Sequence, residues 1–485
     1  MRFSVFLFFL ALYVATTAGH IYTVDSYLNY SVTKAIATRG TIEIPKFMMT
    51  VEGRNGRQYS KLGIGQSLVA LPLYAVGSLV ESTSPGGRIF RAYGDRINVP
   101  DKSKVVVAKV QDLIKLSDLD GARVFFTALT CAFVTALVAL LFWSLLRRFG
   151  LPRRSALWGT CLLGFATPFW VYSRDFFAEP LFTACLLAAF YLLSDLGKSG
   201  YAKPAILAGL ASSLGILTRV SFIPICAIFA AYIVVSAGDV RLGGRKAMWY
   251  AAGCAPGVVI QAVLDLVRFG DVFQTGYHTA FDQGFSLNLA KGLWWNLASP
   301  YRSILLFAPA VIIFAFGLRE LMRKRRAEAW LMIAIIVYVF LVYSGWWAWH
   351  GGWCWGPRFL LPVIPLFLLP GLVAARTRPW LVALAVVLGV VGFGVNLAGV
   401  LINYTAPYDY WIQIGKLDWA EANIQQFSPV AVHLKALFAT SPRLYDLWFI
   451  QAWRFAGWKM LWPGMGLVFV VLVTARHILR PVRQE

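Results

Sequence analysis

Charge is scarce in this sequence, and so are the residue patterns that build metal or disulfide scaffolds. Charged side chains make up 14% of the 485 residues, against roughly 25% in an ordinary soluble domain, and 59% of the residues are apolar. The six cysteines show no Cys-x-x-Cys spacing, and no His-Glu-x-x-His motif occurs. These absences exclude a zinc knuckle and argue against a disulfide framework. The composition as a whole excludes an ordinary soluble domain.

The apolar residues occur in discrete blocks. Several blocks run for roughly 17–22 residues without charge, long enough for a helix to cross a ~30 Å hydrocarbon core. The alternating segments of a transmembrane β-barrel are absent from the sequence. We therefore predict an all-α polytopic membrane protein, a single domain over residues 1–485 with about twelve transmembrane helices. The predicted spans are 3–18, 122–146, 155–172, 180–196, 204–217, 220–237, 247–266, 303–318, 329–345, 359–375, 379–402 and 460–476.

The net charge of +22 does not indicate a nucleic-acid partner, because many basic residues cluster in short loops between the apolar blocks. These clusters lie at 147–154, 198–203, 241–246, 319–326, 376–378 and 476–483. This is the positive-inside pattern, so we predict a multi-pass protein of the plasma (inner) membrane with both termini cytoplasmic. An even number of predicted spans separates neighbouring clusters. The predicted spans 204–217 and 220–237 must therefore form a hairpin. The break between them at Thr218-Arg219 places Arg219 near the outer tip of this hairpin. Residues 3–18 fit an uncleaved first helix better than a signal peptide, because Arg2 is the only charged side chain before them.

The extracytoplasmic side is predicted to carry long loops at 19–121, 267–302 and 403–459. In the first of these, residues 64–80 are predicted to form a helix on the membrane surface, interrupted near Pro72. The segment from Asp25 to Arg39 has mixed polarity at helical spacing and predicts a second juxtamembrane helix. Residues 82–121 are polar and contain Gly and Pro, which predicts a flexible loop.

Three acidic residues lie close to predicted outer ends of spans. Asp25, seven residues past the first span, is placed to accept a proton from a hydroxyl nucleophile or to bind a divalent cation. The competing interpretation is a helix cap, for which Asp is a favoured residue. Asp175 and Glu179 stand in a short outer loop, four residues apart and therefore on one face if helical. The competing interpretation of these two residues is a solvated turn. In that case Glu179, directly before Pro180, starts the next helix.

Four cations lie near the same predicted surface: Lys61, Arg219, Arg302 and Arg358. The planar fork of an Arg suits a lipid phosphate at the membrane boundary. The alternative is an interfacial Arg whose stem is buried while its head reaches water.

An aromatic cluster precedes Arg358 and contains five Trp in ten residues, next to a Gly-Gly pair. Aromatic faces stack on sugar rings, although interfacial Trp residues also form belts that anchor membrane proteins. The candidate sugar- or acceptor-binding residues in this cluster are Trp349, His350, Trp353 and Trp355.

The order of these features resembles the GT-C superfamily of membrane glycosyltransferases. One short span is followed by a long outer loop with an early acidic residue, and then by many spans. Four stretches carry the resemblance in detail. They are 60–72, similar to the first-loop pattern YSKYGxGxSLLALP; 177–180, similar to F-(S/A)-E-P; 215–219, similar to GLAxLTR; and 355–362, similar to GPRYLLP. Within the superfamily, the sequence resembles the protein-mannosyltransferase-like and lipid A aminoarabinose transferase-like bacterial enzymes.

The resemblance implies an inverting glycosyltransferase that takes a sugar from a polyprenyl-phosphate donor on the extracytoplasmic face. Asp25 would be the catalytic base, and Glu179, with Asp175, a second acidic site near the acceptor or a metal. Arg219, Arg358, Lys61 and Arg302 would hold the lipid phosphate. The adjacent Asp-Glu pair of many eukaryotic mannosyltransferases is absent, since Ser26 follows Asp25. Whether the enzyme uses a divalent cation or no metal is therefore left open.

The implied partners are the lipid-linked donor, membrane lipids and an acceptor that is a lipid, a protein or a polysaccharide. The alternative function is a flippase or transporter of lipid-linked sugars. A transporter is expected to carry ionisable residues inside its spans, and the predicted spans have almost none.

Overall fold

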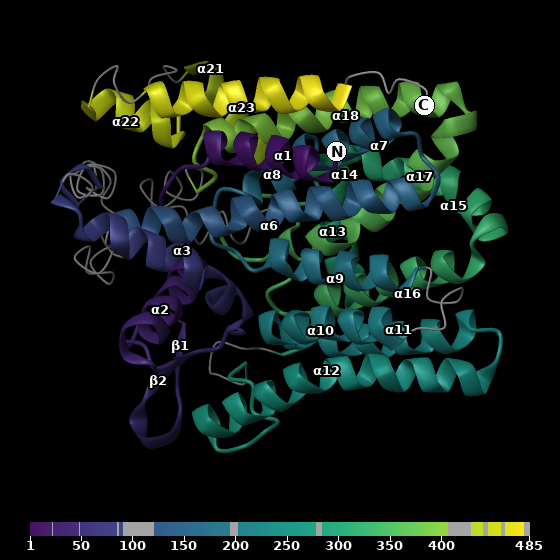
Figure 1. Ribbon diagram of the computed structural model, residues 1–485, viewed down its shortest axis with the longest axis horizontal. Coiled ribbons are helices and arrows are strands. Elements are labelled where there is room, and N and C mark those ends of the chain that lie inside the picture. Colours follow the sequence, from purple (N-terminus) through teal and green to yellow (C-terminus); the bar gives the residue numbers. More distant parts are fainter. Residues whose placement is uncertain are drawn as a thin grey trace.

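The computed structural model consists almost entirely of long, roughly parallel helices (Figure 1). It describes residues 1–21, 23–47, 49–84, 87–90, 121–194, 202–277, 284–405, 428–439, 445–456 and 461–479. Five helical segments within these ranges are long and apolar enough to cross a membrane. They are α6 (Gly121–Arg148), α12 (Val240–Phe269), α16 (Arg326–Gly345), the segment Arg358–Thr377 and α18 (Pro379–Leu401). The protein is thus an integral membrane protein, as predicted.

Shorter helices run between and beside these five. The apolar ones are α1 (Arg2–Thr16), α9 (Glu179–Leu193), α10 (Ala202–Thr218), α11 (Ile223–Ser236), α21 (Pro429–Ala439) and α23 (Leu461–Leu479). The segment Arg358–Thr377 comprises η6 (Arg358–Val363), α17 (Ile364–Ala374) and η7 (Ala375–Thr377). The remaining helical elements are α7 (Arg153–Phe165), α8 (Phe169–Tyr172), η4 (Val220–Phe222), α13 (Leu289–Leu297), α14 (Ile304–Phe307), η5 (Pro309–Ile312), α15 (Ile313–Lys324) and α22 (Trp448–Ala456).

Helices occupy every one of the twelve predicted spans, but two of these spans are broken. The span predicted at 155–172 ends as α7 at Phe165 and resumes as α8 after Pro168, which has no N–H for a helical bond. The span predicted at 303–318 is divided at Pro309 into α14, η5 and α15. The number of helices that cross a bilayer therefore remains a prediction of about twelve.

The first loop folds against the helical bundle. It contains α2 (Val24–Arg39), α3 (Gly65–Ser82) and a small antiparallel hairpin of β1 (Thr50–Glu52) and β2 (Gln58–Ser60) around η1 (Arg54–Gly56). Helices are present at both predicted positions, 25–39 and 64–80. Pro72 does not interrupt α3 as predicted: the helix continues through it, and Pro72 itself is exposed. Most of the loop predicted at 82–121 lies outside the described residues.

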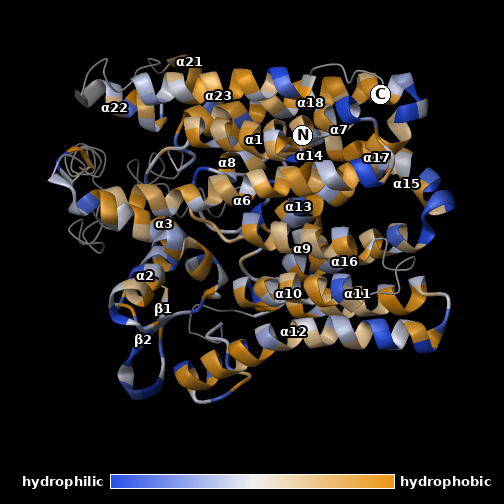
Figure 2. Ribbon diagram, in the orientation of Figure 1, coloured by the Kyte–Doolittle hydropathy of each residue, from blue (hydrophilic) through white to orange (hydrophobic). Residues whose placement is uncertain are grey.

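The two ends of the bundle differ. Figure 1 places α2 and the β-hairpin at one end and the α11–α12 and α15–α16 connections at the other. Hydrophilic residues gather at both ends (Figure 2), and the second end carries the predicted cytoplasmic basic clusters at 241–246 and 319–326. The first loop therefore lies opposite these clusters, as the charge parity predicted.

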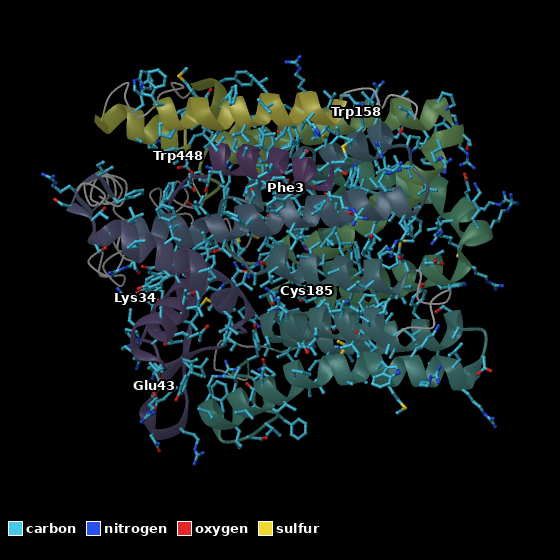
Figure 3. The ribbon with its side chains drawn as sticks, in the orientation of Figure 1. Phe3, Lys34, Glu43, Trp158, Cys185 and Trp448 are labelled. Atoms are coloured by element: carbon cyan, nitrogen blue, oxygen red, sulfur yellow. The ribbon has the colours of Figure 1, made fainter. Side chains whose placement is uncertain are left out.

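Side chains pack between the helices while apolar ones also cover the outside. Cys185 on α9 is buried in the interior, whereas Phe3 on α1 and Trp158 on α7 are each 70% exposed (Figure 3). Where α10 and α12 touch, Gly209 is required: a Cβ on it would lie 2.2 Å from the carbonyl oxygen of Tyr250. Large exposed apolar side chains on single helices are the pattern expected where lipid is the solvent.

Candidate functional site

Four charged side chains from distant parts of the chain meet at the first-loop end of the bundle. The Arg358 Nη2 atom lies 2.6 Å from Asp25 Oδ2, and its Nε atom lies 3.5 Å from Glu179 Oε1. The same Glu179 oxygen accepts a hydrogen bond from Arg219 Nη2 at 2.8 Å. The result is a continuous chain of alternating charge, Asp25–Arg358–Glu179–Arg219, which we call the charged quartet.

Each member of the quartet stands at the end of a helix, which is why the fold can bring the four together. Asp25 lies in the first turn of α2, whose N-cap is Thr23 rather than Asp25 itself. Glu179 is the first residue of α9, and the helix dipole favours a carboxylate at both positions. Arg219 occupies the extended break between α10 and η4, with φ −160°. Arg358 begins η6 directly after Gly356 and Pro357.

The quartet is shielded from water on most sides. The side chain of Glu179 is 3% exposed and those of Arg358, Asp25 and Arg219 are 10%, 14% and 16% exposed. The Arg358 guanidinium lies against the rings of Phe177 and Phe359, 4.9 Å and 4.8 Å from their centroids. Ion pairs in such surroundings are screened far less than surface pairs.

One carboxylate oxygen of the quartet has no hydrogen-bond partner among the described residues. This atom, Glu179 Oε2, is buried beside a small pocket. The pocket is lined by Asp25, Asn29, Leu62, Gly63, Phe177, Ala178, Glu179, Thr218, Arg219 and Tyr277. A buried acceptor without a donor is costly, so a ligand with a hydroxyl or amine group would find a ready partner here.

The quartet does not fit a divalent cation. Each of its two carboxylates already faces an arginine, and two guanidinium groups close by would repel a metal ion. No group of three or more His, Cys, Asp or Glu side chains gathers within the part of the chain that the structure describes. We therefore derive no step that requires a metal at this site.

Lys61 approaches the same pocket from the first loop. Its side chain is buried, and its Nζ atom lies 5.6 Å from the ring centroid of Tyr277, which lines the pocket. Burial raises the pKa of the Tyr277 hydroxyl above its ordinary value of 10.0. Two residues further, Gly63 packs so closely on α10 that a Cβ would lie 2.3 Å from the Leu217 carbonyl oxygen.

Asp175, the third predicted acid, faces away from the quartet. Its Oδ1 atom accepts the N–H of Phe176 at 2.7 Å, and its Oδ2 atom accepts the hydroxyl of Tyr404. Burial raises the pKa of this carboxyl, while its hydrogen bonds, one of them with Ser26, act in the opposite direction. The structure thus places Asp175 as a link between the 173–178 loop, α2 and the end of α18.

The side chain of Arg302 contacts the aromatic cluster and does not line the pocket. Its Nη1 atom donates to the carbonyl of His350 and lies 2.7 Å from Cys354 Sγ, and its Nη2 atom donates to Tyr301 Oη at 3.2 Å. His350 accepts the N–H of Gly352 at its Nδ1 atom. Burial, together with the nearby charges of Arg302 and Arg358, lowers the pKa of His350 from 6.5 to about 3.

The predicted sugar-binding Trp residues differ in what they can reach. Trp355 is 1% exposed, and its Nε1 donates to Asn396 Oδ1 at 3.1 Å, so its ring belongs to the core. Trp349 stacks on Trp295 with ring centroids 5.0 Å apart. Trp353 is partly buried. The quartet therefore unites Asp25, Glu179, Arg219 and Arg358, while Trp355 and Arg302 brace the loop that leads to Arg358.

The sequence patterns missed two contributors to the pocket. Tyr277 was one of many aromatic residues in the loop predicted at 267–302, and nothing in its neighbours marked it. Asn29 follows Asp25 by one helical turn on α2, so the helical spacing could have indicated it.

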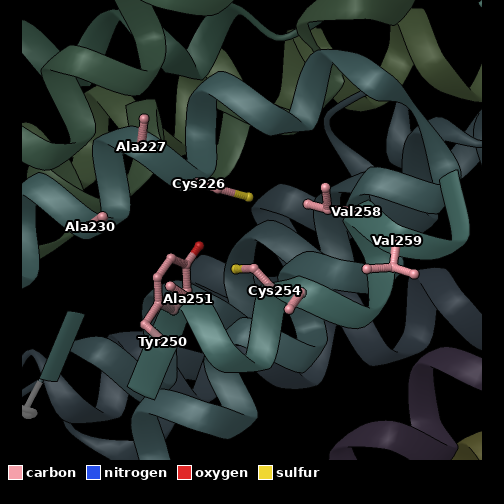
Figure 4. Close-up of a pocket in the computed structure, with 9 residues that line it drawn as sticks. Cys226, Ala227, Ala230, Tyr250, Ala251, Cys254, Val258 and Val259 are labelled. Atoms are coloured by element: carbon pink, nitrogen blue, oxygen red, sulfur yellow. The ribbon is translucent and has the colours of Figure 1, made fainter. Parts of the chain in front are cut away.

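A second pocket, of about 390 Å³, lies between α11 and α12 (Figure 4). Cys226, Tyr250 and Cys254 line it together with alanine and valine side chains. It shares no residue with the quartet and includes no charged side chain. The exposed side chains of Val258 and Val259 on α12 also line this pocket, so it opens on the apolar outer face of the bundle.

Comparison with known proteins places the fold. No family model and no curated protein matches the sequence. Among solved structures, ArnT from Cupriavidus metallidurans in the apo state has a TM-score of 0.52 and 14% identity, over 99% of this chain and 76% of that chain. The chain has the GT-C fold. At this identity the likeness shows the fold alone, and it confirms the fold predicted from the sequence motifs.

Two further solved structures are similar. The structure of ArnT from Cupriavidus metallidurans bound to undecaprenyl phosphate has a TM-score of 0.50 and 14% identity, over 99% of this chain and 77% of that chain. The archaeal oligosaccharyltransferase AglB from Archaeoglobus fulgidus, solved with an inhibitory peptide and a dolichol-phosphate, has a TM-score of 0.42 and 11% identity, over 81% of this chain and 54% of that chain.

Proposed function

We propose that this protein is an inverting glycosyltransferase that moves a sugar from a polyprenyl-phosphate donor to an acceptor hydroxyl on the extracytoplasmic face of the membrane. The observation that carries the proposal is the charged quartet at the end of the bundle: Asp25, Glu179 and Arg219 line one pocket, and Arg358 contacts both of its carboxylates. The ArnT structure that contains undecaprenyl phosphate supports a lipid-phosphate donor for a chain of this fold.

The arginines are suited to the departing phosphate. Breaking the bond between a sugar and a phosphate develops negative charge on the leaving oxygen, and preorganised cations stabilise that charge best where water is excluded. Arg358 and Arg219 both contact the same oxygen of Glu179, Oε1, so they form a pair of donors around one point. Lys61 adds a third cation beside Tyr277, and Arg302 acts by holding the backbone that precedes Arg358.

Asp25 is the proposed base. The acceptor oxygen forms a bond to the anomeric carbon, the bond from that carbon to the phosphate oxygen breaks, and the electron pair leaves with polyprenyl phosphate. The acceptor proton passes to the Asp25 carboxylate. An incoming phosphate competes with Asp25 for the Arg358 guanidinium, and this exchange would leave the carboxylate open to the acceptor.

The remaining acidic and aromatic residues have supporting roles in this proposal. Glu179 Oε2, which lacks a donor among the described residues, accepts a hydrogen bond from the sugar or the acceptor. Asp175, through its hydrogen bonds with Ser26 of α2 and with Tyr404, holds the loop between α8 and α9 and so supports the positions of Glu179 and Asp25. Trp349, Trp353 and His350 would border the sugar from the side of the Arg358 loop.

The proposed extracytoplasmic placement rests on the distribution of charge. The quartet lies at the end of the bundle opposite the basic clusters at 241–246 and 319–326, and clusters of this kind mark the cytoplasmic side. The termini would then be cytoplasmic, and the donor's lipid chain would reach the quartet from the outer leaflet.

The test is sugar transfer by the purified protein in liposomes. Polyprenyl-phosphate donors carrying different labelled sugars are supplied with lipid, peptide and polysaccharide acceptors, in the presence and absence of a chelator. The proposal expects labelled acceptor and free polyprenyl phosphate in equal amounts. If no donor is consumed while lipid-linked sugar crosses the bilayer, the protein is a carrier and the proposal is wrong.

A further inference from the structure

A buried ion pair near the end of α12 lies outside the charged quartet. The Arg268 Nη2 atom lies 2.6 Å from Asp265 Oδ1, and Asp265 Oδ2 accepts a hydrogen bond from Gln261 Nε2 at 2.9 Å. Arg268 is 3% exposed and Asp265 is 1% exposed. All three residues belong to one helix, so their mutual contacts hold no other element in place.

Such a pair is a poor source of stability. Removing two charges from water costs about as much as their attraction returns, and apolar residues of similar volume often serve better. Nearby positions of α12 do carry such residues, including Val263, Leu266 and Val267, all exposed on its outer face. A buried pair at this position therefore indicates a task other than packing.

The pair makes one hydrogen bond to another element among the described residues. Arg268 Nη1 donates to the carbonyl oxygen of Ser60 at 3.1 Å, while Arg268 Nε donates to Leu264 within the helix at 3.3 Å. Ser60 ends strand β2 and directly precedes Lys61. On its other side, the N–H of Leu62 donates to Ser60 Oγ at 3.1 Å, which closes a tight turn around Lys61.

The same end of α12 also fixes the neighbouring segments. A Cβ on Gly53 would lie 2.2 Å from the Arg268 carbonyl oxygen, so the hairpin rests directly on the helix end. Tyr277, the ring that Lys61 lies over, follows α12 by eight residues. Neither Lys61 nor Arg268 lines the quartet pocket itself: Lys61 lies beside Tyr277, which does line it, whereas Arg268 contacts the Ser60 carbonyl.

We infer that Arg268, oriented by Asp265, is a positioning residue that holds the Ser60 carbonyl and thereby directs Lys61 to the phosphate of the lipid donor. The inference deepens the proposed function and rests on it, because it takes Lys61 as a phosphate ligand. Loss of Arg268 leaves the Lys61 ammonium present but free to turn away, so the effect falls on affinity for the lipid phosphate.

The experiment is a double-mutant cycle read by direct binding. Dissociation constants for polyprenyl phosphate, without sugar, are measured for wild type, Arg268→Met, Lys61→Ala and the double variant, together with kcat and KM for the sugar donor. Arg268→Met is expected to weaken binding about tenfold, the value of one charge-assisted hydrogen bond, and to change kcat less than twofold. In the Lys61→Ala background, Arg268→Met should weaken binding less than twofold further.

Matched variants separate positioning from folding. Asp265→Asn keeps the helix polar but releases the Arg268 guanidinium, so it should weaken binding in wild type and not in Lys61→Ala. Arg325→Met removes an ion pair of the same i,i+3 spacing, with Glu328 at the far end of the bundle, and should leave binding unchanged.

The same measurements distinguish a failure of the inference about Arg268 from a failure of the proposed function. If the effects of Arg268→Met and Lys61→Ala multiply, or if kcat falls while binding is kept, Arg268 is structural and the inference is wrong. If Lys61→Ala binds normally while wild type transfers sugar, the inference fails and the proposed function stands. If wild type binds polyprenyl phosphate and transfers no sugar, the proposed function fails, while the coupling between Arg268 and Lys61 is still measured.

Discussion

Replacing Arg358 by methionine should damage folding and catalysis by separable amounts. The change removes the 2.6 Å ion pair with Asp25 and the 3.5 Å contact with Glu179. Leaving one partner of a buried pair uncompensated typically costs about 3–5 kcal/mol. Glu179 keeps Arg219 at 2.8 Å, so only Asp25 loses its ion-pair partner, and we expect a loss near the lower figure, about 3 kcal/mol.

A second substitution should repair the stability and not the activity. Asp25→Asn in the Arg358→Met background removes the uncompensated charge, so thermal unfolding in detergent should move back toward the wild-type midpoint. Sugar transfer by both variants should remain about 10²–10³-fold below wild type, the usual cost of losing one group that stabilises a developing anion. The double variant would also lack the proposed base.

Arg378→Met serves as the control. Arg378 pairs with Glu320 at 3.6 Å, is 38% exposed and lies in the predicted cytoplasmic basic cluster at 376–378, so its loss should cost less than about 1 kcal/mol and leave transfer intact. Near-normal transfer by Arg358→Met, or recovery of transfer in the double variant, would refute the role given to Arg358.

Three smaller predictions concern the pocket and its borders. Glu179→Gln leaves Arg219 without its buried ion-pair partner and should lower kcat about tenfold or more, measured on the same donor; unchanged kcat would contradict the role of Glu179. Gly63→Ala brings a Cβ within 2.3 Å of the Leu217 carbonyl oxygen, so a drop in unfolding free energy of about 1–3 kcal/mol is expected, and a variant as stable as wild type would show that the contact is looser. His350 has its pKa lowered to about 3 in the fold, so protonation of the unfolded chain should weaken wild type as the pH falls from 6.5 toward 3. His350→Gln should remove that part of the pH dependence in thermal unfolding, and identical pH profiles would show that the imidazole titrates normally.

Hydropathy located the helices well because the requirement for uncharged helices in lipid is severe. It located their breaks poorly, since Pro168 and Pro309 stand inside apolar runs that look continuous in the sequence. The β1–β2 hairpin was missed because strands of three residues leave too short an alternation to detect. The hairpin packs against the end of α12, a contact that the sequence does not show.

For the site, short motifs at helix ends predicted the right neighbours. Asp25, Glu179, Arg219 and Arg358 each follow or begin an apolar span, so the fold had to place them near one surface. The direction in which each side chain points could not be predicted from the sequence. Asp175 stands only four residues before Glu179 but faces Tyr404, because the loop between α8 and α9 is not helical.

The position of the lipid phosphate tests the central claim most directly. A structure of the protein with polyprenyl phosphate bound would locate the phosphorus atom independently of any assay. We predict phosphate oxygens within hydrogen-bond distance of Arg358 and Arg219, with the Asp25 carboxylate facing the open side of the pocket. A phosphate bound elsewhere, with the 2.6 Å contact between Arg358 and Asp25 unchanged, would contradict the account.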